Sequence, residues 1–183
     1  EAAVRDTMMS YVRENRGKGM TSSYKNETLI WHTGGHGPQT VFVGDSNCGH
    51  YFPRIHKLLH EKAGQSRGAT FIWNGGACPI PGVGDRNRPG TRNVMPTFDA
   101  MMATNPLVDR VVLAAAWNRR FQNKDYLIDG VSLETSEGKR RALDALGRMI
   151  SQLVASGKRV ALVLPVPSGP GLDPSRIYPR SFL

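Results

Sequence analysis

The chain of 183 residues lacks the features that mark several large classes of protein. No apolar run approaches the ~20 residues that a membrane-spanning helix needs, and the mean hydropathy is −0.37. Neither a P-loop nor a glycine-rich dinucleotide fingerprint occurs, so no nucleotide cofactor is implied. No basic motif with interleaved aromatic residues is present either, which argues against a nucleic-acid partner.

Cysteine and histidine are also scarce. The two cysteines, Cys48 and Cys78, belong to no CxxC pair, which argues against structural zinc. Each follows a predicted strand near the same sheet edge, so a disulfide in an oxidising compartment and two free buried thiols both remain open. His56 and His60 have a spacing that one helix face could use for a metal, but no third ligand is evident, and we expect no metal site.

Acidic residues are outnumbered, and the net charge is +9. Such a balance fits either a basic soluble surface or attraction to an anionic partner, for example an acidic glycan or a lipid head group. Arg119 and Arg120 either line the mouth of a cleft or are plain surface charge. The same two interpretations hold for the arginines of a long loop, which are Arg86, Arg88 and Arg92.

Apolar runs alternate with helical patterns through the middle of the chain. Strands are predicted at 40–44, 69–73, 110–116 and 159–164, and helices at 51–63, 96–103 and 136–156. Loops are predicted at 74–93 and 117–133. This alternation predicts an α/β fold, a three-layer α/β/α sandwich with a parallel sheet. The unbroken apolar runs are typical of strands that are buried on both faces. Thr135 or Ser136 is expected to cap the longest helix, and Gly157 to end it.

The two ends of the chain differ from this middle part. We expect a helix over residues 2–14 and an irregular segment over 15–39, which is rich in Gly, Ser, Thr and His. Residues 1–39 would then be an N-terminal arm or linker, and 40–183 the α/β domain. Prolines follow the last predicted strand, and 177–183 add no closing element, so we expect the domain to continue beyond residue 183.

The most informative segment is Gly44-Asp45-Ser46, between a predicted strand and a helix. Open α/β sheets place their chemistry at the carboxyl ends of parallel strands. The loops after the next two strands carry Asn74-Gly75-Gly76 and Trp117-Asn118. Together the three loops offer a hydroxyl, flexible backbone N–H groups and a side-chain amide. These groups suit a serine nucleophile with an oxyanion hole.

These segments resemble the SGNH (GDSL-like) hydrolase family, in the order nucleophile block, glycine block and asparagine block. The similarity is greatest to the SGNH domains fused to bacterial membrane O-acyltransferases. Residues 77–81, 111–117 and 163–167 share that subgroup's pattern, and the resemblance covers roughly residues 40–174. It implies a flavodoxin-like SGNH fold that is C-terminally incomplete here.

The resemblance also implies roles for single residues. Ser46 would carry the acyl group, and the N–H groups of Ser46 and of Gly75 or Gly76 would hold the oxyanion with the Asn118 side chain. Asn47, Trp117 and Arg119 are candidates for contacts with substrate. Asn47 stands where the subgroup usually has His.

One expected block does not occur. The family's Asp-x-x-His, which supplies the base and its orienting carboxylate, is absent after Pro167. A serine without a base is a poor nucleophile. We therefore expect the base beyond residue 183, with His32, His36 and His50 as weaker alternatives within the chain.

The function implied by the resemblance is O-acyl transfer, most simply O-acetyl transfer, or ester hydrolysis on a bacterial cell-surface polysaccharide or lipopolysaccharide. The partners would be this glycan and a membrane acyltransferase domain of the same parent chain, at the periplasmic or extracytoplasmic side of the inner membrane. No cofactor is implied. One alternative is a stand-alone carbohydrate or lipid esterase; another is a non-catalytic glycan-binding module that kept the fold and lost the base.

Overall fold

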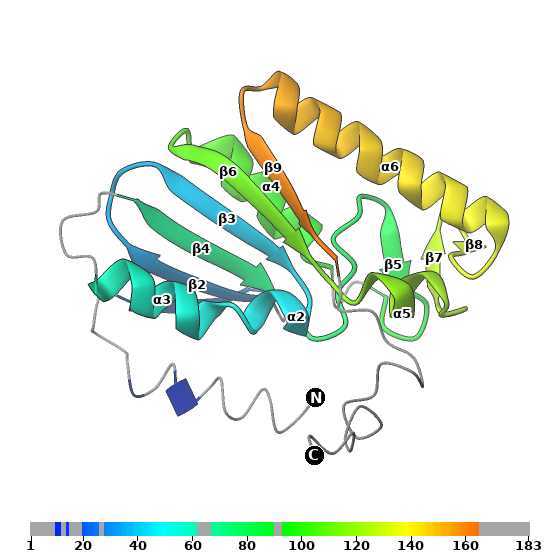
Figure 1. The fold of residues 1–183 in the computed structure, drawn as a ribbon. Coiled ribbons are helices and arrows are strands. Elements are labelled where there is room, and N and C mark those ends of the chain that lie inside the picture. The colour runs from blue at the N-terminus through cyan, green and yellow to red at the C-terminus, as the bar shows by residue number, and fades with distance from the viewer. Residues whose placement is uncertain are drawn as a thin grey trace, which may run out of the picture.

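A computed structural model describes residues 10–11, 14, 20–25, 28–61, 67–89 and 93–164. Its main element is a six-stranded mixed sheet with the order β1-β2-β4-β3-β6-β9 (Figure 1). The parallel strands are β3 (Gln39–Gly44), β4 (Gly68–Trp73), β6 (Val108–Ala114) and β9 (Arg159–Val163). The predicted α/β class is confirmed, and the order β4-β3-β6-β9 is that of a flavodoxin-like sheet.

The remaining strands, β1 (Met20–Lys25) and β2 (Thr28–Gly34), extend this sheet antiparallel beside β4. The irregular conformation that we predicted over 15–39 is therefore wrong for these residues. Trp31 is fully buried, and pairing along β4 outweighs a composition that by itself favours a loop. The boundary at residue 39 stays a prediction. Of the helix expected over 2–14, residues 10, 11 and 14 are helical, and the others lie outside the described residues.

Helices cover both faces of the sheet, as three layers require (Figure 1). The short α2 (Ser46–Gly49) and α3 (Phe52–Glu61) pack on one face, where Trp31, Phe52 and Phe71 form a core cluster. The larger cluster on the other face lies beneath α4 (Met95–Thr104) and α6 (Ser136–Ala155). Alternate residues of each parallel strand thus contribute to opposite cores.

A second sheet of three short strands lies within segments that we predicted to be loops. β5 (Val83–Asp85) pairs antiparallel with β7 (Tyr126–Ile128), and β7 with β8 (Val131–Ser132). The loop after β6 also contains α5 (Trp117–Phe121). The loop predictions over 74–93 and 117–133 are therefore wrong where these elements form. Runs of two to five residues are too short to show a period.

The start of α6 confirms the predicted cap. The Thr135 hydroxyl accepts a hydrogen bond from the Gly138 N–H at 3.0 Å, which satisfies one of the free N–H groups of the first turn. Within the described residues, each helix is too short or too polar to cross a bilayer.

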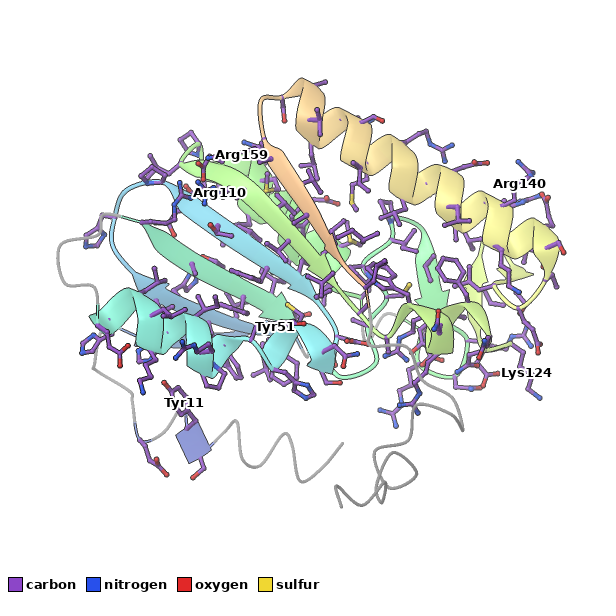
Figure 2. All side chains as sticks on the ribbon, in the orientation of Figure 1. Tyr11, Tyr51, Arg110, Lys124, Arg140 and Arg159 are labelled. Carbon is purple, nitrogen blue, oxygen red and sulfur yellow. The ribbon has the colours of Figure 1, made fainter. Side chains whose placement is uncertain are left out.

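A charge cluster joins the strands at the sheet edge opposite α2. Arg67 donates two hydrogen bonds to Asp109, at 2.6 and 2.9 Å, and Arg159 lies 3.4 Å from the same carboxylate. Arg110 and Arg159 are register partners and lie side by side (Figure 2). The hydrogen bonds from Arg67 lower the pKa of Asp109 from 3.8 to about 2. Three strand ends are thereby linked through one carboxylate.

This lowered pKa predicts a defined acid sensitivity. The folded-state pKa of Asp109 is depressed, so the stabilisation is complete above pH 3.8 and is lost as the pH falls toward about 2. We expect Asp109→Asn to lower the urea midpoint at neutral pH and to flatten its fall across this window. Asp144→Asn, a surface control on α6, should keep the wild-type slope. Equal slopes for wild type and Asp109→Asn would contradict the assignment.

Candidate active site

Ser46 begins α2 directly after β3, as predicted. Asp45 is the helix N-cap, and its Oδ1 accepts a hydrogen bond from the Asn47 N–H at 2.8 Å. Asp45 is fully buried, whereas Ser46 and Asn47 are half-buried. Among the described residues, the Ser46 hydroxyl has no hydrogen-bond partner, and its backbone N–H at the helix start is likewise without an acceptor. Hydroxyl and N–H are therefore both available to a ligand.

The glycine segment after β4 forms a tight turn. The Asn74 carbonyl accepts a hydrogen bond from the Ala77 N–H at 3.0 Å, and Gly76 has a φ of +86°. A positive φ at the third position is typical of a type II turn and favours glycine. The N–H groups of Gly75 and Gly76 donate no hydrogen bond within the described part of the chain. The turn thus presents two unused backbone donors.

The third loop, after β6, carries three predicted site residues in α5. Asn118 and Arg119 are exposed, and the Asn118 amide side chain makes no hydrogen bond among the described residues. Trp117 is buried, and its indole N–H donates to the Val163 carbonyl at 2.8 Å. Asn118 is therefore available as a donor, while Trp117 belongs to the core at the end of β9 and not to an open surface.

Two hydrogen bonds hold the three loops together at one sheet edge. The Asn74 N–H donates to the Gly44 carbonyl, at 3.3 Å, and the Ala116 N–H donates to Asp45 Oδ2, at 2.9 Å. β3 and β6 approach so closely that a Cβ on Gly44 would lie 1.8 Å from the Ala114 carbonyl oxygen. Only glycine fits there, and it permits Asp45 to reach the neighbouring loop.

A buried ion pair lies beneath this edge. Arg120 Nη2 is 2.7 Å from Asp45 Oδ2, and the two side chains are 9% and 0% exposed. The expectation that Arg120 lines a cleft mouth or forms surface charge is therefore wrong. Arg120 Nη1 also donates to the Tyr126 hydroxyl at 3.0 Å. The burial of Arg120 and Tyr126 could not be predicted from the sequence, because arginine and tyrosine in a polar segment ordinarily indicate exposed positions.

Cys48 and Cys78 are both buried free thiols, so the disulfide alternative is not what the structure shows. Burial raises the pKa of Cys48 well above its usual value, and the negative charge of Asp45 adds to the effect. Burial raises the pKa of Cys78 to about 12, although Arg120 acts in the opposite direction. A protonated, buried thiol is a poor nucleophile, which leaves Ser46 as the better candidate.

The histidines lie mostly away from Ser46. His32 and His36 line a cavity of about 500 Å³ with Gln39, at the amino ends of the parallel strands. His56 is buried, with its Nδ1 2.9 Å from the Tyr11 hydroxyl. His50 caps the carboxyl end of α2 and is exposed. Among the described residues, no group of three or more His, Cys, Asp or Glu side chains could hold a metal ion.

Solved structures offer only distant likeness. Legionella pneumophila LapA has a TM-score of 0.38 and 13% identity, over 88% of this chain and 47% of that chain. The Cif epoxide hydrolase from Acinetobacter nosocomialis has a TM-score of 0.31 and 14% identity, over 85% of this chain and 58% of that chain. This chain thus spans about half the length of these proteins, and the scores are too low to carry any conclusion about activity. No curated protein matches the chain.

A family model matches nearly the whole chain. The model describes the SGNH domain fused to AT3 domains, and it matches residues 15–182. This range contains the serine, glycine and asparagine segments described above, together with β1 and β2. SGNH domains are of the esterase and acyltransferase type. The chain therefore belongs to the family of SGNH domains that are fused to AT3 domains.

Proposed function

We propose that the site transfers an O-acyl group through an acyl-Ser46 intermediate. The supporting observation is that Ser46 lies half-buried and without a hydrogen-bond partner at an edge where three loops with unused donors are held together. Gly75 and Gly76 offer backbone N–H groups, and Asn118 offers an amide. Donors aimed at one developing negative charge are the usual means of stabilising acyl transfer.

In the first step the Ser46 Oγ forms a bond with the acyl carbonyl carbon, and its proton passes to a base. The tetrahedral intermediate carries its negative charge on the former carbonyl oxygen, which the N–H groups and the Asn118 amide bind. It collapses as the donor oxygen leaves with the proton. An acceptor hydroxyl or water then attacks the acyl-serine by the same route in reverse.

The base is expected from an Asp-x-x-His block C-terminal to residue 183, as the family resemblance implies. His32 and His36 lie at the opposite sheet edge, and His56 is hydrogen-bonded to Tyr11. His50 is the exposed histidine nearest to Ser46 in sequence, four positions later. His50→Ala therefore belongs in any test of the base.

We propose O-acetyl esters of a bacterial cell-surface glycan, a polysaccharide or lipopolysaccharide, as donor or product. The family model's fusion to AT3 domains supports a membrane acyltransferase domain as a partner in the parent chain. The domain would then act at the periplasmic or extracytoplasmic side of the inner membrane. The net charge of +9 is compatible with an acidic glycan.

Labelling with a serine-reactive fluorophosphonate tests the nucleophile. We expect intact-mass labelling of this chain, or of a form extended at its C-terminus, and complete loss of labelling in Ser46→Ala. Ser151→Ala, an exposed serine of α6, is the matched control and should label like wild type.

Each outcome separates the alternatives. Labelling of the extended form alone places the base beyond residue 183, whereas loss of labelling in His50→Ala places it at His50. If neither form labels, the acyl-serine proposal fails and the glycan-binding module becomes the better account.

The proposed oxyanion hole predicts the effect of Asn118→Ala. Removal of one donor lowers kcat for an aryl acetate by about 100- to 1000-fold, with KM little changed. The thermal midpoint should stay that of wild type, because the side chain is exposed and makes no hydrogen bond among the described residues. Gln122→Ala, an exposed amide at the end of the same helix, should retain full activity. Equal kcat in Asn118→Ala and Gln122→Ala would remove Asn118 from the site.

A further inference from the structure

We propose that Arg120 and Tyr126 are positioning residues of this site, which hold the glycine turn in register with Ser46 through a buried chain of hydrogen bonds that begins at Asp45. The inference rests on the proposed function, because it assigns these residues to the same acyl transfer. Neither side chain contacts the reacting atoms in this assignment; both act through the groups that do.

The hydrogen-bond chain begins at Asp45, whose two carboxylate oxygens accept three hydrogen bonds. Oδ1 accepts from the Asn47 N–H, and Oδ2 accepts from the Ala116 N–H and from Arg120 Nη2. The carboxylate is thus turned away from the surface and joins the loop after β3 to the loop after β6. A carboxylate with all these partners has a structural role and not that of a general acid.

The direction of the next two hydrogen bonds follows from chemistry. A guanidinium group can only donate, so the Tyr126 oxygen accepts from Arg120 Nη1. The single Tyr126 hydroxyl proton is then committed to the Gly76 carbonyl, with which the structure pairs it. The Arg120 guanidinium carbon also lies 5.0 Å from the centre of the Tyr126 ring, which adds a cation–π contact. Donation by a cation strengthens the onward hydrogen bond of the tyrosine.

The hydrogen-bond chain ends at the Gly76 carbonyl, in the glycine turn. Gly75 and Gly76 have no side chains to pack, and glycine is the residue with the greatest backbone freedom. Among the described residues, the side-chain hydrogen bond to this glycine pair comes from Tyr126. A misplacement of catalytic donors by about 1 Å can cost on the order of a hundredfold in rate. Tyr126 therefore has a direct means of affecting catalysis without touching substrate.

Arg120 has a second, electrostatic effect. An uncompensated carboxylate beside Ser46 would oppose the negative charge that develops in the transition state. Arg120 Nη2 lies 2.7 Å from Asp45 Oδ2, so the positive charge of the guanidinium offsets the negative charge of the carboxylate. With Arg120 in place, Asp45 organises the loops without this cost.

Tyr126→Phe tests the proposal, since it removes the hydroxyl and keeps the ring. In a form with Ser46-dependent aryl acetate hydrolysis, we expect kcat to fall on the order of tenfold to a hundredfold while KM stays near the wild-type value. Relaxation measurements by heteronuclear NMR should show lower order parameters for the Gly75 and Gly76 backbone N–H groups than in wild type. Arg148→Met, on the exposed face of α6, is the surface control.

The charged residue is tested by a conservative pair of variants. Arg120→Lys keeps a cation beside Asp45 and should retain more kcat than Arg120→Met. Should both fail to fold, Tyr126→Phe decides. A kcat equal to wild type in Tyr126→Phe overturns the inference, and so does wild-type mobility of the Gly75 and Gly76 backbone N–H groups.

These results are distinct from failure of the proposed function. If the wild-type protein shows no Ser46-dependent hydrolysis, the proposed acyl transfer fails, and with it the expected fall in kcat of Tyr126→Phe. If the mobility of the Gly75 and Gly76 backbone N–H groups is unchanged in Tyr126→Phe, the proposed hold of Tyr126 on the glycine turn is overturned, whatever the activity.

Discussion

The buried carboxylate of Asp45 is the constraint on which the arrangement of the site depends. Moving an ionised carboxylate out of water is costly unless it is paired and hydrogen-bonded. Here two backbone N–H groups and the Arg120 guanidinium meet that need. Removal of one partner from such a pair typically costs about 3–5 kcal/mol, so the loops after β3 and β6 cannot separate without a large loss of stability.

The same pair links the sheet to the proposed chemistry. The close approach of β3 and β6 at Gly44 delivers Asp45 to the Ala116 N–H, and α5 then delivers Arg120 to Asp45. Tyr126, from the small second sheet, carries the connection to the glycine turn. The second sheet thereby contacts the glycine turn, Gly75-Gly76, which has no side chains of its own, at the edge where Ser46 lies.

The sequence was most informative where a pattern is long. The parallel strands, the limits of α6 and its Thr135 cap follow from apolar runs and a local capping preference. β1 and β2 were missed because their pairing with β4 is decided by partners distant in sequence. Ser46, the glycine pair and Asn118 could be singled out from their places after strands, and the structure brings their loops to one edge.

The buried network could not be predicted in the same way. Arg120 follows another arginine in a polar segment, and only the fold shows that one of the two side chains points inward to Asp45 while Arg119 is exposed. Long-range hydrogen bonds of this kind leave no period in a sequence. They depend on the order of the strands in the sheet, which the sequence does not reveal.

The most direct test of the account is mass spectrometry of the enzyme during turnover of an acetyl ester. Rapid quenching of a form active on an aryl acetate should yield a protein heavier by one acetyl group, located on Ser46 by peptide mapping and absent from Ser46→Ala. Turnover that persists in Ser46→Ala, or an acetyl group found on another residue, would contradict the acyl-serine mechanism.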